Sequence, residues 1–110
     1  MNDIWMSGKL LETPTLNTKG EGVSWSRFLL KNTSQAKNGK TKYLDIKCVA
    51  FDKCAAAITY SFKKDDFILV RGRLNPKQYT AKDGSVKEGM EIVVRSFSKI
   101  GEELAGAARG

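Results

Sequence analysis

The chain has 110 residues, 41% of them hydrophobic and 28% charged, which predicts a single globular domain with one modest core. It contains no histidine and two cysteines, which excludes Ser-His-Asp and Cys-His catalytic groups and most zinc sites. A formal net charge of +7 is compatible with simple solubility, but it also favours a polyanionic partner.

Alternation of apolar and polar residues predicts the first two strands. Residues 2–11 alternate over their whole length, and residues 23–31 do so again after a turn-forming Gly-Glu-Gly at 20–22. In the second segment we expect Phe28 and Leu30 to face the core, because they share one side of the strand.

Residues 41–53 carry the most informative pattern of the chain. One face of this third predicted strand is apolar and is expected to be buried, with a free thiol among its residues Leu44, Ile46, Cys48 and Ala50. The other face consists of Tyr43, Asp45, Lys47, Val49 and Phe51. Two aromatic residues that flank a lysine are typical of a surface that stacks bases and contacts phosphates. A polar hairpin loop, residues 32–42, precedes the strand and centres on an Asn-Gly turn.

A short helix is predicted at residues 52–62. Cys54, Ile58 and Phe62 recur every four residues, with three consecutive alanines after the first of them, which indicates a helix with one buried side. We expect Asp52 to act as its N-cap.

A second hairpin follows the helix. Residues 67–74 predict a fourth strand, and Pro76 argues against its continuing as a central strand, because proline cannot donate a hydrogen bond to a sheet. Residues 77–81 lead into an Asp-Gly turn, and residues 86–97 return as the fifth strand.

The order of these elements predicts the fold. Five strands with one short helix between the third and the fourth match an all-β protein, the five-stranded Greek-key barrel of an OB-fold, over residues 1–100. Residues 101–110 are expected to form a short flexible tail. An α+β sheet with the helix packed on one face is the alternative.

The sequence gives no basis for an enzyme or a membrane protein. No GxxxxGKS/T or GxGxxG pattern follows a predicted strand, and no nucleophile, base and orienting group come together. We therefore expect no catalytic activity, no cofactor and no metal. No apolar run approaches the length of a membrane span, so we expect a cytoplasmic protein without a membrane partner.

Basic residues interleave with aromatic ones on four predicted strands. Taken alone, each such residue is more often ordinary surface, but in a curved sheet the faces that carry them can converge on one nucleic-acid strand. The residues of this pattern are Arg27, Lys31, Lys42, Tyr43, Lys47, Phe51, Arg71, Arg73, Lys77 and Tyr79.

Several segments together resemble bacterial-type single-stranded DNA-binding proteins, over roughly residues 1–100. The similarity is carried, in chain order, by MNDIWMSGKL, WSRFLLKN, CVAFDKCA, YSFKKDDFILVRGRL and KQYTAKDGS. The resemblance implies an OB-fold that forms a homodimer or homotetramer and wraps single-stranded DNA with little sequence preference.

The resemblance also implies roles for individual residues. It assigns base stacking to Phe51 and Tyr79, and it places Lys53, Lys64 and Lys77 near the path of the DNA strand. The first strand, with Met1, Ile4 and Trp5, corresponds to the one that the family uses in subunit pairing, although local packing is an equal alternative for the tryptophan.

The sequence departs from the family pattern in four places. Asp45 stands where the family usually carries an aromatic residue, so we expect Tyr43 to replace it. Ala36 falls near a second aromatic position, and Asp65 stands where a glycine is common. In the family, a Gly/Pro/Gln-rich tail with an acidic tip recruits replication and repair proteins. Such proteins are possible partners here too, but the sequence has no counterpart of the tail, which puts recruitment by that route in doubt.

The leading hypothesis is a non-catalytic, oligomeric protein that coats and protects single-stranded DNA during replication, recombination or repair, in a bacterial cell or in the host of a phage or plasmid. One alternative is a replication-restart accessory OB protein that contacts a helicase or its loader. Another is a basic OB module that binds an acidic protein partner or RNA.

Overall fold

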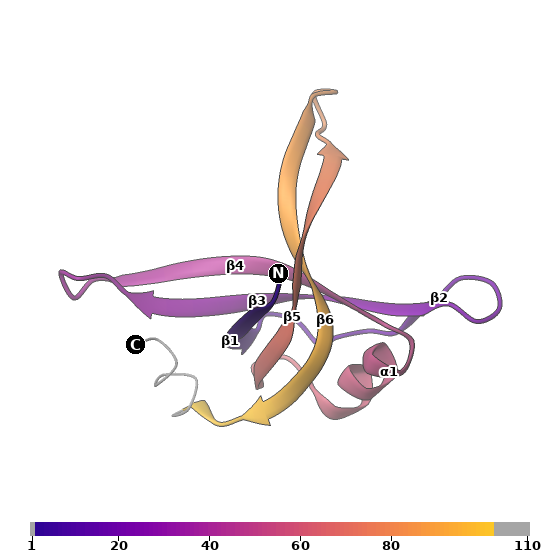
Figure 1. The fold of residues 1–110 in the computed structure, drawn as a ribbon, viewed down its shortest axis with the longest axis horizontal. Coiled ribbons are helices and arrows are strands. Elements are labelled where there is room, and N and C mark those ends of the chain that lie inside the picture. The colour runs from indigo at the N-terminus through magenta and orange to yellow at the C-terminus, as the bar shows by residue number, and fades with distance from the viewer. Residues whose placement is uncertain (1, 103–110) are drawn as a thin grey trace.

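Seven elements follow one another in the computed structural model, which describes residues 2–102 (Figure 1). They are β1 (Ile4–Leu10), β2 (Asn17–Thr18), β3 (Ser24–Gln35), β4 (Thr41–Phe51), α1 (Asp52–Ser61), β5 (Phe67–Thr80) and β6 (Val86–Ile100). The five predicted strands and the helix are all present. The additional element, β2, is a two-residue strand that pairs with the start of β3. Most of the predicted tail lies outside the described residues.

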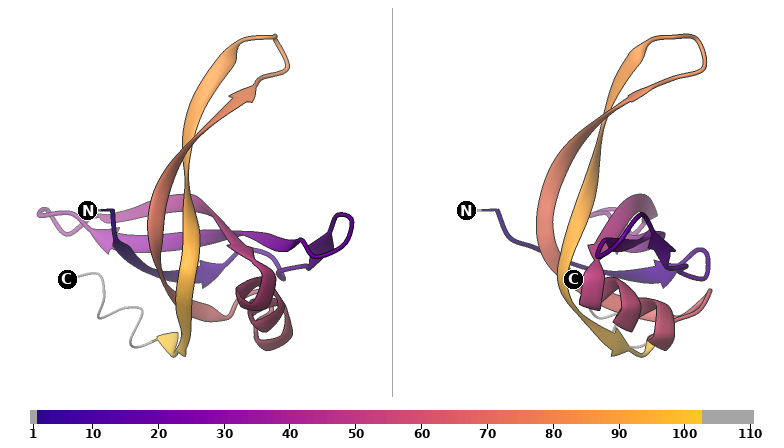
Figure 2. Two further views of the ribbon diagram at one scale, coloured as in Figure 1. Left: turned by 45° about the vertical axis from the view of Figure 1, so that its right-hand side comes forward. Right: turned by 90° about the vertical axis from the view of Figure 1, so that its right-hand side faces the viewer.

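The long strands close into a barrel. Their order is β1-β5-β6-β4-β3, and β1 pairs again with β3 through Lys9 and Leu10, which completes the circle. All of these pairs are antiparallel except β4 with β6, which is parallel. The helix covers one end of the barrel, between β4 and β5 in the chain (Figure 2). The OB-fold prediction is therefore confirmed, and the open α+β sheet is wrong.

The barrel is filled by side chains from the strands and from α1. The buried cluster consists of Leu10, Phe28, Leu30, Cys48, Ala50, Ala55, Ile58, Phe62, Ile68, Val70, Ile92 and Val94. Burial raises the pKa of the Cys48 thiol to about 12, so this free cysteine stays protonated at neutral pH, as expected of a core residue. Leu44 was also predicted to be buried, but it is half exposed, because at that point the hairpin has already left the barrel.

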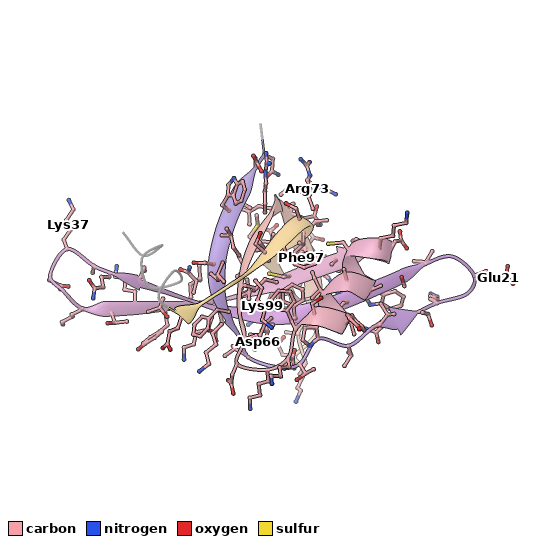
Figure 3. The ribbon with its side chains drawn as sticks, turned by 90° about the horizontal axis from the view of Figure 1, so that it is seen from below. Glu21, Lys37, Asp66, Arg73, Phe97 and Lys99 are labelled. Atoms are coloured by element: carbon pink, nitrogen blue, oxygen red, sulfur yellow. The ribbon has the colours of Figure 1, made fainter. Side chains whose placement is uncertain are left out.

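The end of the barrel near α1 is closed by aromatic packing and one ion pair (Figure 3). The rings of Phe62 and Phe97 pack edge to face with their centroids 5.5 Å apart. Lys99 Nζ lies 5.7 Å from the centroid of Phe62 and 3.6 Å from the carboxylate of Asp66. These contacts attach the end of β6 to the segment between α1 and β5.

Both long hairpins extend beyond the barrel, further than predicted. β3 and β4 stay paired as far as Gln35 and Thr41, so the loop predicted over residues 32–42 is reduced to the five residues between those two. β5 and β6 stay paired as far as Thr80 and Val86. In Figure 1 the β5–β6 hairpin rises above the barrel and the β3–β4 hairpin reaches out to its side.

β5 continues through Pro76, beyond the predicted end of the strand at residue 74, but it is not a central strand there, in agreement with the prediction from the proline. β1 pairs with β5 only as far as Gly72, so beyond that residue β6 is the single strand neighbour of β5. Leu74 turns its N–H and C=O away from β6, and the Asn2 side chain binds them at 2.9 and 2.8 Å. Pro76 lies two residues further along, so its nitrogen points to the same outer edge, where no ladder hydrogen bond is lost.

The helix begins without the predicted side-chain cap. Its N-cap is Phe51, and Asp52 is the first helical residue, with a φ of 52°. The Asp52 carboxylate accepts a hydrogen bond from the Ser24 N–H at 3.3 Å, which connects the start of α1 to β3. The N-cap prediction is therefore wrong. No helix within residues 2–102 is long and apolar enough to cross a membrane.

Candidate nucleic-acid interface

The outward sides of β3, β4 and the β5–β6 hairpin join into one surface. Residues paired across neighbouring strands point to the same side, so the register shows which side chains share it. Lys47 of β4 lies between Leu29 of β3 and Glu91 of β6, and Glu91 in turn lies opposite Asn75 of β5. We call this surface the outer face; it comprises Trp25, Arg27, Leu29, Lys31, Tyr43, Asp45, Lys47, Val49, Phe51, Arg73, Asn75, Lys77, Tyr79, Gly89, Glu91 and Val93.

Three aromatic rings are exposed on the outer face. Tyr43, Phe51 and Tyr79 are 64%, 45% and 47% exposed, whereas an aromatic side chain with only a structural role would be expected to be mostly buried. Lysine ammonium groups lie over the two tyrosine rings. Lys31 Nζ is 4.6 Å from the centroid of Tyr43, and Lys47 Nζ is 5.4 Å from that of Tyr79. The second contact links β4 to the β5–β6 hairpin, so cations and rings from both hairpins lie together.

The middle of the outer face is buried. Val49 belongs to this side of β4 by alternation, yet it is only 1% exposed, because Arg27 on one side and Val93 on the other flank it. Glu91 is buried as well, with 10% of its side chain exposed, and Lys77 Nζ lies 3.8 Å from its carboxylate. Alternation places both residues on this face, but their burial depends on the parallel pairing of β4 with β6, for which the sequence carries no signal.

The structure brings eight of the predicted site residues together on the outer face: Arg27, Lys31, Tyr43, Lys47, Phe51, Arg73, Lys77 and Tyr79. Three others lie elsewhere. Lys42 points to the opposite side of β4 from Tyr43, Lys53 lies in the first turn of α1, and the backbone N–H of Lys64 donates to Thr13 Oγ1 at 3.0 Å after the helix.

Arg71 lies on a different side of the barrel, beside β1. Its Nε and Nη2 donate to the two carboxylate oxygens of Asp3 at 3.1 and 2.9 Å, and its guanidinium lies 5.0 Å from the ring centroid of Trp5. The hydrogen bonds from Arg71 hold the pKa of the Asp3 carboxyl below its usual value. Trp5 is 59% exposed and Ile4 packs against the core, while Met1 lies outside the described residues.

The outer face has the composition of a nucleic-acid surface and not that of a metal site. Within residues 2–102 no three His, Cys, Asp or Glu side chains come close enough together to hold a metal ion. Rings with lysines above them and arginines beside them offer stacking surfaces and phosphate contacts on the same strands.

Comparison with known proteins agrees with this geometry. A model of the family described as the single-strand binding protein family matches residues 1–100. This chain belongs to that family. The single-stranded DNA-binding protein of Fusobacterium nucleatum is 36% identical over 107 residues, an alignment that covers 93% of this chain and 68% of the other. That of Clostridium perfringens is 32% identical over 111 residues, with 100% and 72% covered.

A third relative shows how much longer such proteins can be. The single-stranded DNA-binding protein of Malacoplasma penetrans is 24% identical over 108 residues, and the alignment covers 98% of this chain but only 56% of the other. The chain therefore spans between about half and about three quarters of the length of these three relatives.

One departure from the family pattern has a clear structural setting. Asp65, at a position where the resemblance implies glycine, adopts a φ of 76°, in the left-handed region that favours glycine. Its N–H donates to Leu10 O at 2.9 Å, and its carboxylate lies 3.6 Å from Lys9 Nζ. The backbone conformation is thus kept here by an aspartate, one of the residue types that tolerate it best.

Proposed function

We propose that this chain binds single-stranded DNA along the outer face, with little sequence preference, and that it coats and protects exposed strands during replication, recombination or repair. The observation that carries the proposal is the presence of three exposed aromatic rings on one surface with lysines and arginines. Stacking of bases on such rings tolerates any sequence, because every base has a π-face.

Two kinds of contact hold the DNA in this proposal. Phe51, Tyr43 and Tyr79 stack bases, while the basic residues of β3 and of the β5–β6 hairpin bind phosphates. The lysine above each tyrosine ring must move aside when a base stacks there, and it is then free to pair with a phosphate of the same strand. Binding of this kind weakens as the salt concentration rises.

The wider biology is also a proposal. The chain acts by binding alone, without catalysis, in the cytoplasm, and it assembles as a homodimer or homotetramer. The exposed Trp5 on β1 supports a subunit contact along that strand, because a large ring on a barrel surface is a suitable interface anchor. Sedimentation of the free protein distinguishes these assemblies from a monomer.

Alanine substitution of the proposed stacking residues tests the function. We expect Phe51→Ala and Tyr79→Ala each to weaken binding to a thymine oligonucleotide by about 1–3 kcal/mol, because each removes one stacking surface. Fluorescence anisotropy of a labelled oligonucleotide gives the affinities. Tyr60→Ala is the matched control, since Tyr60 lies on α1 and is 93% exposed. Unchanged affinity in both the Phe51 and Tyr79 variants would place the site elsewhere.

A further inference from the structure

Glu91 is an unexpected residue at the centre of a surface proposed to bind a polyanion. Only 10% of its side chain is exposed, and no hydrogen bond to its carboxylate is formed within residues 2–102. Lys77 Nζ, 3.8 Å away, is near enough for an ion pair but too distant for a hydrogen bond.

A carboxylate in this position has unused capacity as an acceptor. Its two oxygens can accept about four hydrogen bonds, and they stay within reach of the surface, because within residues 2–102 the only fully enclosed side-chain polar atom without a hydrogen bond is Ser26 Oγ. The ion pair with Lys77 leaves most of these lone pairs open. The carboxylate is therefore prepared to accept hydrogen bonds from a ligand that lies on the outer face.

The ring of Tyr79 lies over β6 at a position two residues before Glu91. A Cβ placed on Gly89 would be 3.5 Å from Tyr79 Cε1, so the ring extends over Gly89. Glu91 follows two residues later on the same side of β6, about 7 Å along the strand. Gly89 has no side chain, so this position places nothing between the Tyr79 ring and the Glu91 carboxylate. A base that stacks on Tyr79 in place of the Lys47 ammonium can therefore extend one edge along β6 toward Glu91.

We propose that Glu91 accepts a hydrogen bond from the exocyclic amino group of the base stacked on Tyr79, and that it thereby favours cytosine and adenine over thymine and uracil at this position. The inference deepens the proposed function and rests on it. At C4 cytosine presents an amino donor, whereas thymine and uracil present a carbonyl oxygen that would face the carboxylate as a second acceptor, so their one donor on this edge is the neighbouring N3–H. The preference is local, so it leaves most of the site indifferent to sequence.

Two homopolymers of equal length test the inference, oligo-dC and oligo-dU, because these bases differ at C4 and N3 while neither carries the methyl group of thymine. The measured quantity is the ratio of their dissociation constants at mildly alkaline pH, where cytosine is neutral. For the wild type we expect oligo-dC to bind about five- to tenfold more tightly, the size of one ordinary net hydrogen bond, because the carboxylate is also paired with Lys77. We expect Glu91→Gln to bring the ratio close to one, because an amide both donates and accepts.

Two control variants separate recognition from simple charge effects. Glu88→Gln removes a carboxylate from the same strand, but on the side opposite the outer face. Glu88 is exposed there and pairs with Gln78 of β5, so this variant should leave the ratio of the two dissociation constants unchanged. Lys77→Met removes the ion pair. If Glu91 served only to position Lys77, both Lys77→Met and Glu91→Gln would weaken binding of the two oligonucleotides equally.

Each possible result of these measurements either supports or overturns the proposed role of Glu91. Equal binding of oligo-dC and oligo-dU by the wild type overturns the inference without any variant, so a poorly folded Glu91→Gln protein would not leave it untested. A ratio that survives in a folded Glu91→Gln variant overturns it too. In both cases the proposed function stands, because single strands are bound. If the wild type binds neither oligonucleotide, the proposed function itself fails.

Discussion

Asp45 places a negative charge on the outer face, at a position where the sequence resemblance led us to expect an aromatic residue. Register pairs it with Lys31 of β3, whose ammonium group lies over Tyr43. The carboxylate is exposed, so its repulsion of a bound phosphate is weakened by solvent but not removed. Tyr43, on the same side of β4, offers a stacking surface two residues away.

We therefore expect Asp45→Trp to tighten binding of single-stranded DNA by about 1–3 kcal/mol, because it adds a ring and removes a repulsive charge. Asp45→Asn is the control for charge alone and should give a smaller gain. Anisotropy titrations at a fixed salt concentration measure both. A folded tryptophan variant that binds more weakly than the wild type would mean that the strand follows a different path.

At the scale of single residues, the alternation of side chains along a strand was sufficient to predict most members of the outer face. It predicted that Tyr43, Lys47 and Phe51 share one side of β4, because side chains in a strand point alternately to its two sides. It did not predict that Val49 and Glu91 on this face are buried, because burial there depends on strands that are far apart in the sequence.

The element that shapes the outer face is the β5–β6 hairpin, which bends as it leaves the barrel. The register shifts between Arg71 and Gly72, where β5 passes closest to β6. A Cβ on Gly72 would overlap the carbonyl oxygen of Val93 and lie 2.8 Å from its carbonyl carbon. Because both are backbone atoms, no side-chain rotation can relieve the overlap.

We expect Gly72→Ala to lower the free energy of unfolding by about 3 kcal/mol, the upper part of the usual cost of overpacking. Gly89→Ala, in the same hairpin, is the control. Its Cβ would meet only ordinary contacts, so it should be neutral or slightly stabilising. Urea denaturation measures both, and equal stability of the two variants would contradict the close approach described for Gly72.

At the scale of elements, the sequence predicted the kinds of element better than their ends. The Asn-Gly and Asp-Gly turns are where they were expected, with Gly39 and Gly84 at φ values of 82° and 84°. The β3–β4 hairpin is longer than predicted because its polar residues 32–35 and 41–42 pair as strands instead of forming a loop. The β5–β6 hairpin is longer because Pro76 lies on an edge: β5 has only one strand neighbour there, which is a property of the barrel and not of the local sequence.

At the scale of the whole molecule, both the net positive charge and the closed barrel contribute to binding. The net charge of +7 favours any polyanion, and sequence composition cannot distinguish single-stranded DNA from duplex DNA. The folded barrel adds what composition lacks, since it brings rings from β4 and β5 beside lysines of β3 and β4. Exposed rings can stack only on bases that are accessible, which requires a single strand.

One titration tests this account most directly: binding of oligo-dT and of a duplex of the same length, followed by intrinsic tyrosine and tryptophan fluorescence at several salt concentrations. We predict quenching by oligo-dT and much weaker binding of the duplex. The logarithm of the association constant for oligo-dT should fall linearly with the logarithm of the salt concentration, with a slope of about 0.7 per phosphate contact. Absence of quenching at low salt, or a duplex bound as tightly as the single strand, would contradict the central claim.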